Sequence, residues 1–327
     1  MKNKNLILAV LGVGLVLAGI FFFPKSSNGG YINMHEHLQN MDDVEVLFEM
    51  NKELGIEKTV LLGSSDATIY LHPKFQNYDE NNYELLKIRE KYPDKFEVLC
   101  TTYWHDPDQV SKIASCYERG AKGVKLYNGH GNFYEIPLDD PVMLPVYKYI
   151  EDNGLILLMH VNSNKYLDEF ERVLKKFPNM KTICPHFCLI SRKLNTLSEL
   201  MDNYPNLYID MSFGAIEFTA AGFNRFSSKP ERFAQFIDQY QDRIFFGTDQ
   251  VVTNIKTQKH SDELAHVFEG YLRMLDSKEF HLQTTWQDQY DEVYRGLELP
   301  EELLQKILKD SPQKLLDSVP EWEASEL

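Results

Sequence analysis

The sequence predicts an α/β protein, a (β/α)8 (TIM) barrel preceded by a single hydrophobic helix at the N-terminus. Beyond residue 30, eight short apolar runs rich in β-branched residues alternate with longer amphipathic stretches. The starts of consecutive runs lie 25 to 37 residues apart, which leaves room for one strand, one helix and two loops. Strands that alternate with helices pair in parallel through crossovers. Eight such units over residues 30–327 suit a fold that typically needs about 250 residues.

The eight apolar runs are the expected strands. In chain order they cover residues 31–37, 59–63, 96–103, 123–127, 155–161, 182–187, 207–211 and 244–248. An open, doubly wound sheet is the alternative arrangement of the same units. That fold would favour a glycine-rich phosphate loop after the first strand, whereas this chain has Met34-His35-Glu36-His37 there. The closed barrel is therefore the preferred prediction.

Capping residues and helix breakers locate the helices between these strands. Asp42 or Asp43 can cap a helix over residues 44–54, and Pro107 opens residues 108–118, which Gly120 follows. Pro141 is expected to begin the next helix, and Gly154 to end it.

The last third of the chain shows a less regular pattern. Residues 213–226 are predicted to form a long aromatic loop after the seventh strand. Residues 258–299 are long enough for two helices that flank the eighth unit. Leucines at 303–308 and 315–316 then indicate a closing amphipathic helix, broken or kinked at Pro312.

Residues 1–29 are predicted to be a membrane segment and linker, separate from the domain over residues 30–327. Lys2 and Lys4 precede an unbroken apolar run, residues 6–23, that would span about 27 Å as a helix. We expect an uncleaved anchor with the catalytic domain outside the cytoplasm, because the two lysines favour a cytoplasmic N-terminus. Cleavage as a signal peptide, giving a secreted protein, is the alternative, although phenylalanines 21–23 stand where small residues are expected.

Composition excludes several classes of protein and partner. The chain has 49 acidic and 34 basic residues and a formal net charge of −15, so nucleic acid is not the expected partner. The expected partner is a small-molecule substrate, and a homo-oligomer is compatible with this composition. Four cysteines are too few for a disulfide scaffold. Cys184 and Cys188 flank His186 and are expected to be buried, inert thiols rather than thiolate metal ligands.

Polar residues stand at the carboxyl ends of several predicted strands. His35 and His37 are two positions apart at the end of the first strand, so their imidazoles point the same way. His160, His186 and Asp249 end the fifth, sixth and eighth strands. Taken singly, each fits a hydrogen-bonded core residue or a turn. Together they meet at the face where barrel active sites lie, and four imidazoles with a carboxylate suit Zn²⁺ or another divalent transition metal.

These motifs resemble the amidohydrolase superfamily, most closely its amidohydrolase-related branch of metal-dependent hydrolases. The resemblance spans about residues 31 to 317 and is specific as an ordered set of motifs. The matching pieces are residues 33–38 (NMHEHL), 120–127 (GAKGVKLY), 158–160 (LMH), 185–187 (PHF), 246–249 (FGTD) and 299–308 (LPEELLQKIL).

The resemblance implies a metal held by His35, His37 and His160, with Asp249 beside it. His186 would bind a second metal or polarise the substrate. Lys125 stands where some members carry a carbamylated lysine that bridges two metals, and where others use the lysine to contact substrate. One essential metal is favoured over two.

The implied reaction is hydrolysis of an amide, lactone or ester C–N or C–O bond by metal-activated water. Asp249 would be the proton shuttle, and His186 would stabilise charge on the carbonyl oxygen. Non-oxidative decarboxylation at the same site is the alternative, and a non-catalytic metal-binding surface domain is the second alternative.

Loop residues above the strand ends are candidates for substrate binding. Tyr127 follows the fourth strand and Arg192 follows the sixth. An arginine at this face would hold a substrate carboxylate in a bidentate pair.

Overall fold

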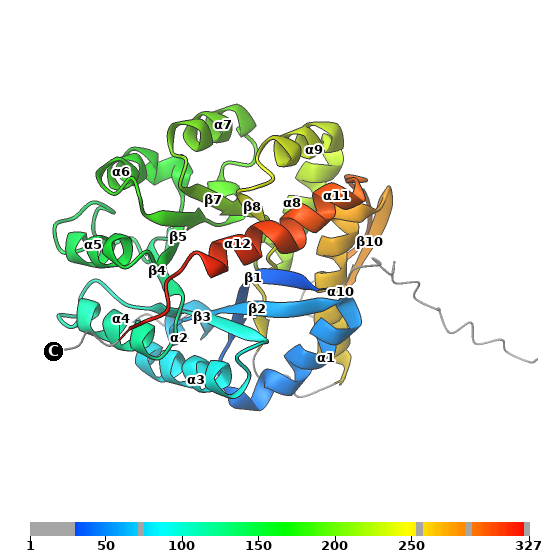
Figure 1. Cartoon of the computed structure of the whole chain (residues 1–327). Coiled ribbons are helices and arrows are strands. Elements are labelled where there is room, and N and C mark those ends of the chain that lie inside the picture. The colour runs from blue at the N-terminus through cyan, green and yellow to red at the C-terminus, as the bar shows by residue number, and fades with distance from the viewer. Residues whose placement is uncertain (1–29, 71–74, 253–257, 285–289, 324–327) are drawn as a thin grey trace, which may run out of the picture.

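The chain forms a curled, nine-stranded parallel sheet surrounded by helices (Figure 1). The computed structural model describes residues 30–70, 75–252, 258–284 and 290–323. The anchor predicted over residues 6–23 lies outside these ranges. Neighbouring strands follow the order β8-β7-β6-β5-β4-β3-β2-β1-β9. The strands of this sheet are β1 (Tyr31–Leu38), β2 (Ile56–Leu62), β3 (Phe96–Thr101), β4 (Gly123–Gly129), β5 (Ile156–Val161), β6 (Lys181–Cys184), β7 (Leu207–Asp210), β8 (Ile244–Phe245) and β9 (Val251–Val252).

The two ends of the sheet meet at β1. The Met34 N–H donates to the Phe246 carbonyl over 2.9 Å, and His37 and Leu38 pair with the two residues of β9. The strand order is sequential, so all eight predicted strands are confirmed, and the doubly wound alternative is wrong. Closure leaves β1, which carries two of the predicted metal ligands, hydrogen-bonded on both sides.

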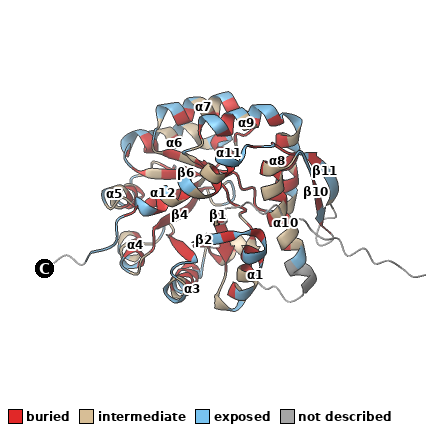
Figure 2. Ribbon diagram, turned by 45° about the vertical axis from the view of Figure 1, so that its right-hand side comes forward, coloured by how far each residue is buried: buried red, intermediate tan, exposed pale blue. Residues whose placement is uncertain are grey.

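Helices cover the outside of the sheet, and their apolar faces pack against it (Figure 2). They are α1 (Val44–Leu54), α2 (Asp66–Tyr70), α3 (Tyr78–Lys91), α4 (Gln109–Glu118), α5 (Leu144–Asp152), α6 (Ser163–Lys176), α7 (Leu194–Asn203), α8 (Ile216–Ser228), α9 (Pro230–Gln239) and α10 (Gln258–Asp276). Every residue of β3 and β4 is buried, as expected for a parallel strand with neighbours on both faces. The core therefore lies inside the sheet and between the sheet and the helices.

Glycine at position 123 is required by the close approach of β4 to β5. A Cβ there would lie 2.0 Å from the Ile156 carbonyl oxygen, which belongs to the backbone of the paired strand. We expect Gly123→Ala to lower the free energy of unfolding by roughly 1–3 kcal/mol, because overpacking forces the strands apart. Denaturant titration measures this loss. The control is Gly131→Ala, whose Cβ would have no atom nearer than 3.9 Å, and an equal loss in both variants would contradict the argument.

Three expectations for helices α5 and α8 and for the stretch after α10 need correction. Residues 216–228 form helix α8 rather than part of a loop, because buried Thr219, Ala220, Phe223 and Phe226 recur at helical spacing. Helix α5 begins at Leu144, after a turn at Pro141. The stretch after α10 is a hairpin of β10 (Glu279–Thr284) and β11 (Tyr290–Arg295) rather than a second helix. Alternating burial along β10 is the strand pattern that the prediction overlooked.

The C-terminal helix is not broken at Pro312. Helix α11 (Glu301–Gln305) continues through a π-helical turn (Lys306–Asp310) into α12 (Ser311–Asp317). The wider turn precedes the proline, which stands at the start of α12, where its missing N–H is tolerated. The π-helical turn and α12 contact β1 and β8, so this segment covers one end of the sheet (Figure 1).

The four cysteines form two disulfides rather than staying as thiols. Cys100 of β3 pairs with Cys116 of α4, and Cys184 of β6 pairs with Cys188. The prediction of inert thiols beside His186 is therefore wrong. Within the described ranges, no helix is long and apolar enough to cross a membrane.

Candidate metal centre

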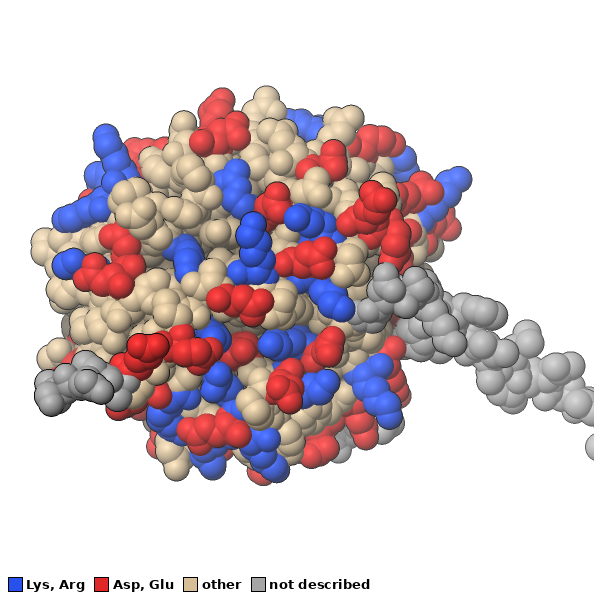
Figure 3. Space-filling model, viewed as in Figure 1, with Lys and Arg blue, Asp and Glu red and all other residues tan. Residues whose placement is uncertain are grey.

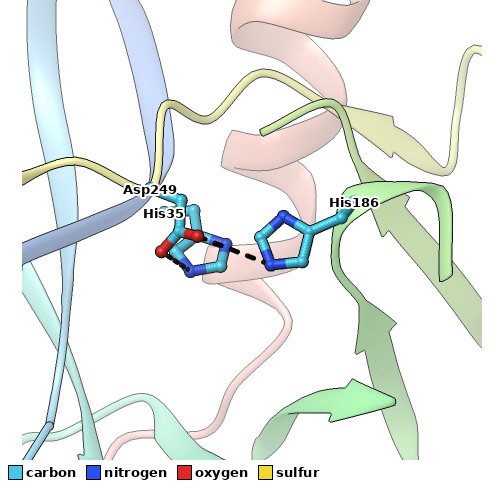
Figure 4. Close-up of side chains that lie close together, drawn as sticks. All are labelled: His35, His186 and Asp249. Carbon is cyan, nitrogen blue, oxygen red and sulfur yellow. Dashed lines mark ion pairs between the residues drawn. The ribbon is translucent and has the colours of Figure 1, made fainter. Parts of the chain in front are cut away.

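Three histidines converge on the carboxylate of Asp249 at the carboxyl ends of the strands. The Asp249 Oδ1 atom lies 2.9 Å from His35 Nε2 and 3.0 Å from His37 Nε2, and Oδ2 lies 3.5 Å from His186 Nε2. Figure 4 shows His35 and His186 facing Asp249 from different parts of the sheet. The structure thus brings together four of the five residues that the sequence places at strand ends.

The hydrogen bonds behind the imidazoles direct their Nε2 atoms toward the centre. His35 Nδ1 lies 2.7 Å from Asp210 Oδ2, His37 Nδ1 lies 3.2 Å from the Leu62 carbonyl, and His186 Nδ1 lies 2.9 Å from the Ser212 carbonyl. Because carbonyl and carboxylate oxygens only accept, each Nδ1 carries the proton. In its neutral form, each ring therefore offers its Nε2 lone pair to the centre, as in metal-binding histidines.

The charge of the group suits a cation. Burial would raise the pKa of Asp249, but the histidines around it hold that pKa well below its usual value. Burial lowers the pKa of His37 and of His186, which keeps both rings neutral. Burial also lowers the pKa of His35, but Asp249 and Asp210 outweigh it and raise that pKa overall, so this position favours a cation.

The donor set fits a divalent transition metal. Ligand atoms of His35, His186 and Asp249 all lie within 4.8 Å of one another. Neutral imidazole nitrogens and one carboxylate oxygen are the donors that Zn²⁺ and similar ions prefer.

His160 and Lys125 lie beside this group. The ring centroid of His160 lies 4.9 Å from that of His186 and 4.4 Å from that of His130. Lys125 Nζ lies 3.3 Å from His35 Nε2. Burial lowers the pKa of Lys125 to about 8, so part of the amine is neutral near pH 7, as a carbamate requires.

Asp210 supports two of the histidines, and the sequence argument missed it. It ends β7 and is fully buried. Besides His35 Nδ1, it accepts hydrogen bonds from the His186 N–H over 3.0 Å and from the Ser212 hydroxyl over 2.6 Å. Its position at a strand end is the same signal that identified Asp249, so the sequence could have revealed it.

Replacing Asp210 by Asn is expected to weaken metal binding by about 10–100-fold, because an amide accepts less strongly from His35 and can offer it the wrong group. Competition with a chelator measures the dissociation constant. Asp152→Asn, at an exposed carboxylate of α5 paired with Lys148, is the control and should bind as the parent does. Unchanged affinity in the Asp210 variant would show that this carboxylate does not orient a ligand.

A second buried network lies behind β1 and was also missed. Glu36 accepts hydrogen bonds from the Asn33 amide over 2.9 Å and from the Thr248 hydroxyl. Burial raises the pKa of Glu36 well above its usual value, and Asp249 raises it further. Through these hydrogen bonds, Glu36 links the first strand to the residue before Asp249.

The backbone is strained where it presents two site residues. His186, Phe187, Cys188 and Leu189 are four successive left-handed residues, with φ between 51° and 59°, and Asp249 has φ 54°. Such conformations cost of order 1–3 kcal/mol each in residues other than glycine and cluster at functional sites. The Cys184–Cys188 disulfide spans the turn that carries His186.

The group opens into a cavity of about 810 Å³. His37, Lys125, His160, His186 and Asp249 line it, as does the predicted substrate residue Tyr127, whose hydroxyl donates to the Gly63 carbonyl over 3.1 Å. Arg192, the other predicted substrate residue, is exposed and is not among the lining residues. Arg225 of α8, which the sequence argument did not single out, lines the cavity instead.

The fold and this arrangement of ligands define a metal-dependent barrel enzyme. The family model described as amidohydrolase matches residues 74–317, and the chain belongs to that family, whose members generally use divalent metals. This confirms the resemblance and the expectation of an enzyme. A comparison with curated proteins finds no match.

Solved structures with the same fold share little sequence with the chain. An uncharacterised TIM-barrel protein from Bordetella bronchiseptica is 17% identical with a TM-score of 0.60, over 89% of this chain and 99% of that one. The 2,6-dihydroxybenzoate decarboxylase from Rhizobium is 16% identical with a TM-score of 0.56, over 88% and 99%. Dihydroorotase from Campylobacter jejuni is 16% identical with a TM-score of 0.55, over 91% and 85%.

Proposed function

We propose that the chain is a metal-dependent hydrolase that cleaves an amide, lactone or ester bond in a small molecule. The observation that carries the proposal is the Asp249 carboxylate shared by three imidazoles inside a large cavity. His35, His37 and His160 would hold one divalent ion, Zn²⁺ by donor type, with Asp249 beside it and Lys125 available as a carbamylated bridge to a second. When bound, such an ion acidifies water and polarises a carbonyl.

Asp249 is suited to moving the proton in this reaction. Its carboxylate stays ionised, so it can accept a proton from the attacking water and return it to the leaving group. Its two oxygens face different histidines, which fixes the orientation of the carboxylate in the cavity.

The proton positions divide the two remaining tasks between different histidines. His186 donates through Nδ1 to Ser212, so its neutral Nε2 has no proton for a carbonyl oxygen and suits a ligand or base. His130 has the opposite tautomer, because its Nδ1 accepts from the Asn132 N–H over 3.1 Å. The His130 Nε2–H is therefore the better donor to charge that develops on the carbonyl oxygen.

Decarboxylation of a carboxylic acid at the same site is the second candidate. A decarboxylase from Rhizobium shares the fold at 16% identity, and the same ligands would serve either reaction. The remaining alternative, a non-catalytic metal-binding surface domain, gives no reason for a large cavity beside the histidines.

A panel of lactones, amides, esters and aromatic acids tests the proposal with the zinc-loaded full chain. Hydrolysis predicts a new carboxylic acid without release of CO₂, whereas decarboxylation predicts CO₂. Absence of turnover across the panel, with one metal bound per chain, would favour the non-catalytic alternative.

We also propose that residues 6–23 anchor the protein with the catalytic domain outside the cytoplasm, or are removed to release it. The two disulfides support this, because such bonds persist in oxidising compartments. The partner remains a small molecule: acidic and basic side chains are interspersed over the face in Figure 3, which shows no broad basic patch for nucleic acid.

Deleting residues 1–29 is expected to leave a domain that folds and unfolds cooperatively without detergent, because the barrel pattern begins at Tyr31. Thermal unfolding followed by circular dichroism measures this. Loss of cooperative unfolding would show that the N-terminal run belongs to the barrel.

A further inference from the structure

Arg225 is a charged residue of the cavity that the proposed mechanism does not use. It lies near the end of α8, half-buried, and lines the cavity that holds the metal centre. Its buried Nε has no hydrogen-bond partner, and no carboxylate among the described residues forms an ion pair with it. An unpaired arginine is unexpected in a chain with 49 acidic and 34 basic residues. Leaving a buried N–H donor without a hydrogen-bond partner is unfavourable.

The guanidinium is held in place on an aromatic ring. Its central carbon lies 5.2 Å from the ring centroid of Phe213, within the range of a cation–π contact. Phe213 is itself fixed, because its N–H donates to the Tyr271 hydroxyl over 2.9 Å. Gly222 makes room for the ring, since a Cβ there would lie 2.3 Å from it. A guanidinium is a planar fork that can bind a carboxylate through two N–H groups at once.

The surrounding charge favours an anion at this place. Burial lowers the pKa of Arg225, and the nearby Arg192 lowers it further, so a second positive charge lies near the guanidinium. Glu217 and Glu263 also line the cavity. They repel a dianion more strongly than a monoanion, which favours a carboxylate over a phosphate.

We infer that the cavity takes substrates that carry a carboxylate apart from the bond that reacts, and that Arg225 binds this carboxylate. The inference rests on the proposed function for the reaction, but the binding site stands on its own contacts. Arg192, exposed outside the cavity, adds to the attraction without touching the ligand. The carboxylate-binding role that the sequence analysis predicted for Arg192 is thus assigned to Arg225.

Calorimetric titration of the zinc-loaded full chain tests the assignment with compounds that cannot be hydrolysed. We expect 3-phenylpropionate to bind at least about tenfold more tightly than neutral 3-phenyl-1-propanol. Arg225→Gln should lower the affinity for 3-phenylpropionate by about 10–100-fold and leave the affinity for 3-phenyl-1-propanol unchanged. Arg225→Lys keeps the charge but not the forked guanidinium, so its affinity for 3-phenylpropionate should lie between those of the parent and Arg225→Gln. Phe213→Leu removes the aromatic ring beside the guanidinium but no charge, and it should lower the affinity for 3-phenylpropionate several-fold.

Arg192→Gln is the matched control and should change carboxylate affinity less than about threefold, as expected for an exposed charge. Equal affinity of the parent and Arg225→Gln for 3-phenylpropionate would overturn the assignment, because the carboxylate would then bind elsewhere, for instance at the metal. Tighter binding of phenylphosphonate than of 3-phenylpropionate would overturn the choice of carboxylate.

The inference and the proposed reaction can fail separately. Arg225-dependent binding in a protein that turns over nothing in the panel would sustain the carboxylate site and remove the hydrolase proposal. Rapid hydrolysis of neutral amides, with kcat/KM unchanged in Arg225→Gln, would sustain the hydrolase proposal and remove the carboxylate site.

Discussion

Replacing Asp249 by Asn is expected to leave most of the metal bound and to lower turnover by about 10²- to 10⁴-fold. The amide keeps an oxygen of the same reach, so contacts with a metal held mainly by imidazoles survive. It has no basic oxygen, so it cannot accept the proton that the ionised carboxylate accepts. Metal content by elemental analysis and kcat on the best panel substrate measure the two effects separately.

His160→Ala is the comparison for the Asp249 variant. His160 is the proposed third imidazole ligand, so the His160→Ala variant should lose both the bound metal and the activity. Near-full turnover in metal-bound Asp249→Asn would rule out the proton shuttle, and His186, whose Nε2 is unprotonated, would become the leading base.

The double variant His35→Ala, His37→Ala should lose the metal completely while keeping the fold. Both imidazoles contact the same oxygen of Asp249, so their removal takes away two ligands of one site. Asp210 and Asp249 then lose buried partners, and we expect the free energy of unfolding to fall by about 3–5 kcal/mol. Elemental analysis and denaturant titration measure these changes.

His105→Ala is the control for the double variant, because His105 is exposed, pairs with an exposed Glu135 and does not line the cavity. It should retain metal and stability. Full metal occupancy in the double variant would place the metal away from β1.

The strands and their site residues could be predicted because one rule governs both. A buried parallel strand is a short apolar run, and a polar residue at its end stands out, as His37 and Asp249 do. Asp210 followed the same rule and was overlooked, since no motif drew attention to it. Four of the tip residues meet because closure of the sheet brings β1 beside β8 and β9.

Other features depend on packing that a linear pattern does not show. Helix α8 was mistaken for a loop because the prediction followed its aromatic composition and not the helical spacing of Thr219, Phe223 and Phe226, which are buried. Arg225 enters the cavity only because that segment is helical, so the error in the element hid the residue. The proton positions of His186 and His130 depend on contacts with Ser212 and Asn132, which determine what each ring can donate.

Closure of the sheet at β1 also determines when the metal centre can form during synthesis. Glu36 and Thr248, which join its two halves, are 212 positions apart, so a ribosome must make most of the chain before they meet. An emerging N-terminal fragment contains His35 and His37 but lacks their shared carboxylate. If the chain is exported as proposed, it crosses the membrane before the site exists. Metal loading is then the last step of maturation, and the ion is taken from the compartment where the enzyme works.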